Sequence, residues 1–175
     1  MKSYAAVTSF RFNCQFVDAV SIATGVCHCG VGVEGIAVGY STKKTVVAKY
    51  GEEDSLIEHN KYSYEMKYDD RGISFWYRFD DPEQKIFAIS VWPESRGFTG
   101  QGIVVGRSTL KDVFAAYGKA EFGTTTSENS WYVEYPGISF HVEYKPNDKQ
   151  RWTPEELLKR KITEIEIVAF ENESR

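Results

Sequence analysis

The chain has 175 residues, and its hydrophobic content of 42% is enough to build the core of one domain of ordinary size. A net charge of -4 gives no general attraction to the phosphates of nucleic acids or to anionic membranes, so we expect neither as a partner. The three cysteines form no even set for disulfides, and the sequence shows no clean export signal. We therefore expect a cytoplasmic protein.

An internal repeat organises the chain. Residues 35–51 read GIAVGYSTKKTVVAKYG, residues 102–118 read GIVVGRSTLKDVFAAYG, and GISF occurs at 72–75 and again at 137–140. Self-similarity of this kind is typical of a duplicated structural unit. We therefore divide the chain into an N-terminal segment with a strand (1–34), a first repeat (35–101), a second repeat (102–170) and a tail (171–175), with both repeats in one compact unit.

The N-terminal segment carries the residues that would suggest a metal or a cofactor. Cys27, His28 and Cys29 are adjacent, and with Cys14 they could offer four soft ligands. Structural zinc sites usually use two separated pairs of ligands, which this segment lacks, so we predict no metal. GVGVEG at residues 30–35 matches the dinucleotide-binding pattern, but extended residues follow it instead of a helix, so we predict no cofactor.

Each repeat opens with the signals of a short helix. In the first repeat, Ser41 or Thr42 can cap the exposed N–H groups of the first turn, and Gly51 can end the helix. The second repeat keeps the pattern, with Ser108 or Thr109 as the cap and its own closing glycine. We expect one short helix at the start of each repeat.

Runs with strand-like alternation follow each predicted helix. They cover residues 61–68, 73–79 and 86–92 in the first repeat, and residues 130–135, 138–144 and 162–168 in the second. Short turns between consecutive runs favour antiparallel pairing. We predict an α+β fold in which two tandem helix-plus-three-strand repeats form one antiparallel sheet, with the helices packed on one face. The sequence TPEELLKRK predicts an extra short helix before the last strand, and residues 10–16 predict a strand in the N-terminal segment.

Alternation along the strands assigns side chains to the two faces of the predicted sheet. The core-facing set is Ile73, Phe75, Tyr77 and Phe79, their counterparts Ile138, Phe140, Val142 and Tyr144, and Phe87, Ile89 and Val91. The other face, which we call the outward face, carries aromatic and charged side chains of the kinds enriched at protein interfaces. Its candidate partner-binding residues are Trp76, Arg78, Trp92, Tyr132, His141 and Glu143. The alternative is that the N-terminal segment or a loop covers this face, so that its tryptophans are ordinary buried residues.

Acid–base chemistry has one candidate pair on the outward face. His141 lies two residues before Glu143, but no nucleophile and no third orienting group accompany them. We therefore expect a structural or interface role and predict that the protein is not an enzyme. His59 lies in a polar connector and is expected to be solvated.

The repeated Gly-x-Ser-Thr-x-x-x-Val pattern with its closing Gly resembles the β-lactamase-inhibitor-protein-like architecture, which small bacterial outer-membrane-assembly lipoproteins share in single-copy form. The resemblance covers residues 35–168. It implies that the two repeats form one continuous sheet whose concave, aromatic-rich face holds a partner protein. The chain departs from the inhibitor family because it has no disulfide within either repeat, one helix per repeat instead of two, and an added N-terminal segment. No inhibitory residue can be matched, so inhibition of a β-lactamase is not implied.

These observations favour a non-enzymatic bacterial protein-binding module, such as an inhibitor or immunity-type protein, that uses its outward face. The alternative is a small-ligand or metal-binding protein, or an enzyme, with a pocket near the N-terminal segment. A third hypothesis is a structural subunit whose sheet face forms a homodimer.

Overall fold

A computed structural model describes residues 26–28, 32–95, 97–125, 130–142 and 153–169. The described residues do not include the predicted strand at 10–16, nor Cys14, Cys29, Glu143 and Tyr144. Among the described residues, no helix is both long and apolar enough to cross a membrane. The cytoplasmic location stays a prediction.

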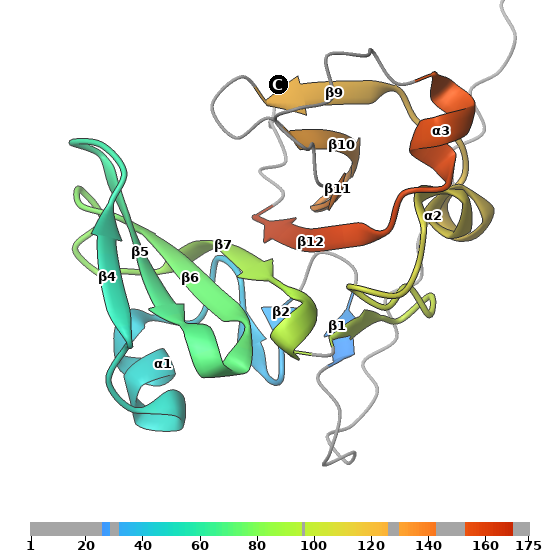
Figure 1. Cartoon of the computed structure of the whole chain (residues 1–175). Coiled ribbons are helices and arrows are strands. Elements are labelled where there is room, and N and C mark those ends of the chain that lie inside the picture. Colours follow the sequence, from blue (N-terminus) through green and yellow to red (C-terminus); the bar gives the residue numbers. More distant parts are fainter. Residues whose placement is uncertain (1–25, 29–31, 96, 126–129, 143–152, 170–175) are drawn as a thin grey trace, which may run out of the picture.

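The described fold is dominated by one eight-stranded antiparallel sheet, which we call the main sheet (Figure 1). Its strands, in spatial order, are β4 (Ser55–Glu58), β5 (Ser63–Tyr68), β6 (Ile73–Arg78), β7 (Ile86–Val91), β12 (Ile162–Val168), β11 (Ile138–Val142), β10 (Ser130–Tyr135) and β9 (Phe122–Thr125). Strands β4 to β7 follow one another as a meander, and so do β9 to β12. The antiparallel pairing of β7 with β12 joins the two meanders into one sheet.

Three helices and a small sheet pack on one side of the main sheet. The helices are α1 (Lys43–Tyr50), α2 (Leu110–Tyr117) and α3 (Pro154–Leu158). The small sheet has the order β3 (Ile36–Ala37), β2 (Gly32–Val33), β1 (Val26–His28) and β8 (Phe98–Thr99). Both the helices and the small sheet contribute to the same hydrophobic core as the main sheet, for example through Val46, Leu110, Leu157 and Val33. The predicted α+β class with an antiparallel sheet is confirmed.

The Gly-x-Ser-Thr turn makes the same contacts at the start of α1 and of α2. The hydroxyls of Ser41 and Ser108 accept the backbone N–H four residues earlier, at 2.9 and 3.0 Å. The carbonyls of the same two serines accept the N–H of Ile86 at 2.9 Å and of Ile162 at 2.8 Å. Each turn therefore joins a helix start to the first residue of the last strand in its own meander.

The helix ends are also held in matching ways. Gly51 and Gly118 follow the two helices with φ of 85° and 91°, a region that favours glycine. The Tyr68 hydroxyl donates to the Gly51 carbonyl at 2.9 Å, and the Tyr135 hydroxyl donates to the Gly118 carbonyl at 2.6 Å. Because the tyrosines lie at the ends of β5 and β10, these bonds tie each helix end to a strand of the main sheet.

Two predicted details of the sheet are wrong. Four strands, not three, follow each of α1 and α2. The strands that the prediction lacked are the edge strands β4 and β9. Edge strands are little buried, so their sequences, SLIE and FGTT, lack the alternation that marks a half-buried strand. Phe79 was assigned to the core but is 48% exposed, because it lies just beyond the end of β6.

The face assignment of Phe87 is also wrong. Tyr77 pairs with Ile86 and Trp76 pairs with Ala88, so Phe87 is an extra residue in a β-bulge. The bulge turns Ile86 into the core and leaves Phe87 half-buried beside Trp76 on the outward face. A matching register shift occurs between β11 and β12, at Thr163.

Candidate functional site

The outward face of the main sheet lies opposite the core, and the predicted site residues are spread along it in three groups. Trp76 and Arg78 both contact Phe87, with the Trp76 ring at 6.5 Å and the Arg78 guanidinium at 5.6 Å from the Phe87 ring centroid. Tyr132 and His141 stack with ring centroids 5.5 Å apart. Trp92 forms a third group with Lys67, whose Nζ lies 4.6 Å from the centre of its ring. Glu143, the remaining predicted residue, lies outside the described part of the chain.

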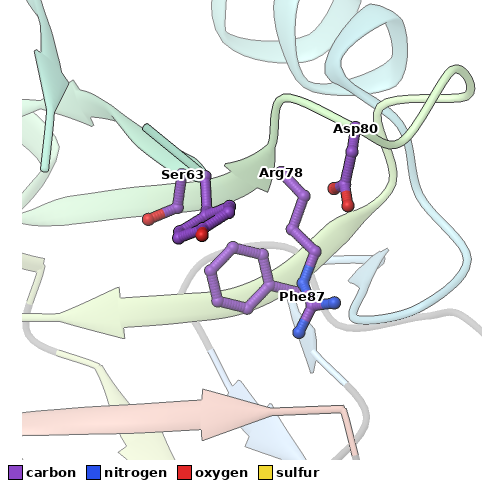
Figure 2. Close-up of a pocket in the computed structure, with 5 residues that line it drawn as sticks. Ser63, Arg78, Asp80 and Phe87 are labelled. Atoms are coloured by element: carbon purple, nitrogen blue, oxygen red, sulfur yellow. The ribbon is translucent and has the colours of Figure 1, made fainter. Parts of the chain in front are cut away.

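A hollow of about 330 Å³ opens at one end of the outward face (Figure 2). Ser63 on β5, Arg78 on β6 and Phe87 on β7 come from three neighbouring strands. Tyr62 and Asp80 join them from the connections beside β5 and β6. Arg78 could be predicted from the sequence but the hollow could not, because the bulge that turns Phe87 outward leaves no pattern in a single strand.

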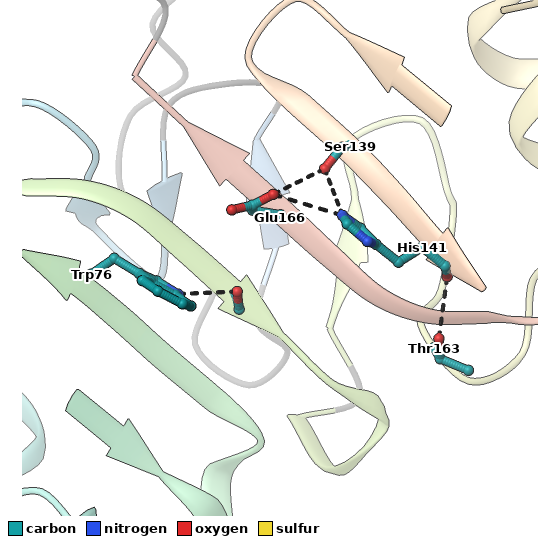
Figure 3. Close-up of polar contacts among 6 residues, drawn as sticks. Trp76, Ser139, His141, Thr163 and Glu166 are labelled. Atoms are coloured by element: carbon teal, nitrogen blue, oxygen red, sulfur yellow. Dashed lines mark hydrogen bonds and ion pairs between the residues drawn. The ribbon is translucent and has the colours of Figure 1, made fainter. Parts of the chain in front are cut away.

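Trp76 is held in place by its neighbours. Its ring stacks on His59 with centroids 4.3 Å apart, and its indole N–H donates to the Ser90 hydroxyl at 3.3 Å (Figure 3). His59 in turn forms a hydrogen bond with Glu65, with 2.8 Å between Nε2 and the carboxylate, and Glu65 is only 4% exposed. The prediction that His59 is simply solvated is therefore wrong, since it lies against Trp76 and holds a buried carboxylate.

The second half of the face carries a polar cluster of Ser139, His141 and Glu166 (Figure 3). The Ser139 hydroxyl lies 2.9 Å from Nε2 of His141 and donates to the Glu166 carboxylate at 3.3 Å. The same carboxylate lies 3.7 Å from Nε2 of His141. The carboxylate predicted beside His141 was Glu143, on the same predicted strand. Glu166 reaches it from β12, because Ser139 and Glu166 are paired across β11 and β12.

The geometry of this cluster does not match a serine nucleophile activated by histidine. In such triads the serine and the carboxylate bond to opposite ring nitrogens of the histidine. Here Ser139 and Glu166 both approach Nε2 of His141. Because the Ser139 hydroxyl donates to Glu166, its oxygen is free to accept a hydrogen bond from Nε2–H of His141, and Ser139 links the other two groups in one hydrogen-bond network.

Short polar side chains occupy the centre of the outward face. Ser74, Ser90, Glu166 and Ser139 follow one another in register across β6, β7, β12 and β11. The three serines are 0%, 1% and 6% exposed in the order Ser74, Ser90, Ser139. Among the described residues the Ser74 hydroxyl has no hydrogen-bond partner, which is costly for a buried polar group. The centre of the outward face is therefore built from buried serines together with Glu166, and the aromatic groups lie on either side of them.

Tyr132 depends on a glycine of the neighbouring strand. Gly123 on β9 pairs with Tyr132 on β10, and a Cβ added at Gly123 would lie 2.3 Å from the tyrosine ring. The ring of Tyr132 therefore covers the backbone of Gly123. A side chain at position 123 would displace the ring.

A small cavity lies near the described end of the N-terminal segment, away from Cys27 and His28. A cavity of about 40 Å³ lies between the β2–β3 hairpin and the main sheet, lined in part by Glu34, Tyr50 and Arg71. The Tyr50 hydroxyl donates to the Glu34 carboxylate at 3.0 Å, and burial, together with the charge of Glu34, raises the pKa of Tyr50 well above its usual value. A space of this size holds about one water molecule and is too small for an organic ligand.

The residues considered as metal ligands are only partly described. Cys27 and His28 belong to β1, and the positions of Cys14 and Cys29 lie outside the described residues. Within the described ranges, no group of three or more His, Cys, Asp or Glu side chains is placed to hold a metal ion.

Comparisons with known proteins identify structures with a similar fold and assign no activity. No family model matches the sequence, and no curated protein matches it. The uncharacterized protein yfeY from Escherichia coli has a similar structure, with 16% sequence identity and a TM-score of 0.55 over 83% of this chain and 99% of that chain. YjgB of Bacillus subtilis, a DUF4309 family protein, has 12% identity and a TM-score of 0.48 over 78% of this chain and 84% of that one.

A third similar structure is an extracellular protein with an SCP domain from Bacillus anthracis, with 12% identity and a TM-score of 0.40 over 91% of this chain and 50% of that one. At these identities a structural likeness concerns the fold alone. None of the three is described as a β-lactamase inhibitor or as an outer-membrane-assembly lipoprotein. The resemblance drawn from the repeated motif therefore stays a prediction.

Proposed function

We propose that this chain is a non-enzymatic protein-binding module that docks a partner protein on the outward face of its main sheet. One observation carries the proposal. The described helices and the small sheet all pack against the opposite face, while half-buried Trp76, Trp92 and Tyr132 remain on the outward one. Half-buried aromatic side chains grouped on one face are typical of protein interfaces.

The side chains of the outward face are also prepared for binding. Trp76 is fixed by His59 and Ser90, and His141 is fixed by Ser139 and Tyr132. Side chains that are already ordered lose little conformational entropy when a partner docks. The half-buried Glu166 carboxylate, which lies between the aromatic groups, would offer the partner a hydrogen-bond acceptor.

We infer that this face arose by tandem duplication of a unit of one helix and a four-stranded meander. The matching serine turns, the matching tyrosine bonds at the helix ends and the matching bulges at Phe87 and Thr163 support this inference. Joining two meanders through β7 and β12 makes the face twice as wide as one unit alone would provide. The result is a surface large enough for a protein partner.

The resemblance to the β-lactamase-inhibitor architecture favours an inhibitor or immunity-type role. In that role the partner is an enzyme, and the outward face covers its active site. The test is whether adding the purified chain lowers the activity of the partner enzyme in proportion to the complex formed.

The binding proposal is tested by removing the two tryptophans. A tagged chain captures partners from lysate, mass spectrometry identifies them, and the dissociation constant of the purified partner is then measured. Trp76→Ala and Trp92→Ala should each weaken binding about 30-fold, the effect of a loss of about 2 kcal/mol at an interface hot spot. Lys44→Ala on α1 and Lys111→Ala on α2 are matched controls, because both residues are exposed on helices packed against the opposite face.

Circular dichroism confirms that each variant is folded. Unchanged affinity in folded tryptophan variants would refute the proposal, and so would a loss of affinity in the helix variants alone. If the tryptophan variants instead convert a dimer into a monomer in sedimentation analysis, the partner is a second copy of this chain.

A further inference from the structure

The hollow at the end of the outward face brings together polar groups that the protein itself does not use. Among the described residues, the side-chain oxygens of Tyr62, Ser63 and Asp80 and the guanidinium of Arg78 make no hydrogen bond and no ion pair. The guanidinium of Arg78 lies 5.6 Å from the ring centroid of Phe87. A guanidinium and a carboxylate therefore line the same hollow without neutralising each other (Figure 2).

We propose that this hollow binds a zwitterionic α-amino acid with an aromatic or apolar side chain. The guanidinium of Arg78 offers paired N–H groups that fit a carboxylate. Asp80 offers a carboxylate to the ammonium group of the same ligand, and the rings of Tyr62 and Phe87 offer apolar contact to its side chain.

The pair of charges selects this ligand class over simpler ones. A simple carboxylate would bind Arg78 but would also lie near the negative charge of Asp80. A simple amine would bind Asp80 and lie near the positive charge of Arg78. A ligand that carries both a carboxylate and an ammonium group can pair with both residues, since unlike charges attract and like charges repel.

The size of the hollow agrees with a single amino acid. A volume of about 330 Å³ is at the lower end of the range for small-molecule sites. Because Arg78 and Asp80 are exposed, the affinity should be modest, with a dissociation constant on the order of 1 mM.

The test is an NMR titration of the full chain with phenylalanine, phenethylamine and 3-phenylpropionate. Phenethylamine lacks the carboxylate, and 3-phenylpropionate lacks the amine. Phenylalanine should shift the amide signals around Arg78 and Phe87 in a saturable manner, and each analogue should bind at least about tenfold more weakly. A simple anion site would bind 3-phenylpropionate as well as phenylalanine, and that result would overturn the proposal.

Two substitutions of exposed residues assign the roles of the charges. Arg78→Gln should abolish the binding of phenylalanine. Asp80→Asn should lower the affinity for phenylalanine until it equals the affinity for 3-phenylpropionate. Arg107→Gln and Asp70→Asn are matched controls, because both residues are exposed and neither lines the hollow. The absence of saturable shifts at about 10 mM phenylalanine would overturn the proposal. Since the titration requires no partner protein, its outcome is independent of the binding role of Trp76 and Trp92.

Discussion

Two buried tyrosines of the core should respond in opposite ways to the same substitution. Tyr68 is 3% exposed and its hydroxyl donates to the Gly51 carbonyl at 2.9 Å. Tyr77 is 0% exposed, and its buried hydroxyl has no hydrogen-bond partner among the described residues. Replacement by phenylalanine removes a useful hydroxyl in the first case and an unpaired one in the second.

The expected sizes follow from the energetics of hydrogen bonds. Tyr68→Phe should lower the free energy of unfolding by about 1 kcal/mol, the net value of one hydrogen bond. Tyr77→Phe should raise it by about 1 kcal/mol, because a buried unpaired hydroxyl carries a desolvation cost of about 1–3 kcal/mol that slightly exceeds the lost packing. The two variants should therefore differ by about 2 kcal/mol, or about 4–8 °C in melting temperature for a chain of this size.

Urea unfolding followed by tryptophan fluorescence measures this difference directly. If the free energy of unfolding depends on urea concentration with the same slope in both variants and in the parent chain, differences between the unfolding midpoints report differences in stability alone. If Tyr77→Phe destabilises the chain as much as Tyr68→Phe does, the reasoning about the unpaired hydroxyl is refuted.

Three further predictions concern the caps, the outward face and alkaline pH. Thr109→Ala should lower the free energy of unfolding by about 1–2 kcal/mol and Thr42→Ala by about 0.5 kcal/mol, because Thr109, unlike Thr42, belongs to a complete capping box. Urea unfolding measures both losses, and equal losses would contradict this prediction. Gly123→Ala should displace the ring of Tyr132 and weaken partner binding in calorimetry, whereas an unchanged affinity would exclude Tyr132 from the interface. Burial raises the pKa of Tyr68 from 10.0 to about 12, so the folded state holds this proton more tightly. The contribution of Tyr68 to the free energy of unfolding should therefore be complete below about pH 9 and be lost between about pH 10 and 12. Over this range the free energy of unfolding should fall less steeply with pH in Tyr68→Phe than in the parent chain, and equal slopes would contradict the assignment.

The local elements of this fold were predictable because their signals are local. The caps at Thr42 and Thr109 and the start of α3 at Pro154 each depend on a few adjacent residues. Alternation in β6 and β11 correctly placed Phe75 and Phe140 in the core, where both are fully buried. These signals identify an element from its own sequence.

Features that depend on pairing between distant residues could not be predicted. The bulge that turns Phe87 outward arises from the register between β6 and β7, which neither strand specifies alone. Glu166 reaches Ser139 because β12 pairs with β11 after an insertion in the chain. The small sheet combines strands of two or three residues, and its parallel pairing of β1 with β8 joins segments far apart in sequence.

Site-specific photo-crosslinking in cells of the source organism shows whether the outward face holds a partner protein. A photo-reactive amino acid replaces Glu134 in one variant and Lys111, on α2, in the other. Glu134 is exposed on β10 and pairs with Ser139 on the outward face, so its replacement leaves Trp76 and Trp92 in place. We expect a discrete covalent adduct with one protein from position 134 and none from position 111. An adduct from position 111 alone, or no adduct from position 134 in a folded variant, would show that the partner does not bind the outward face.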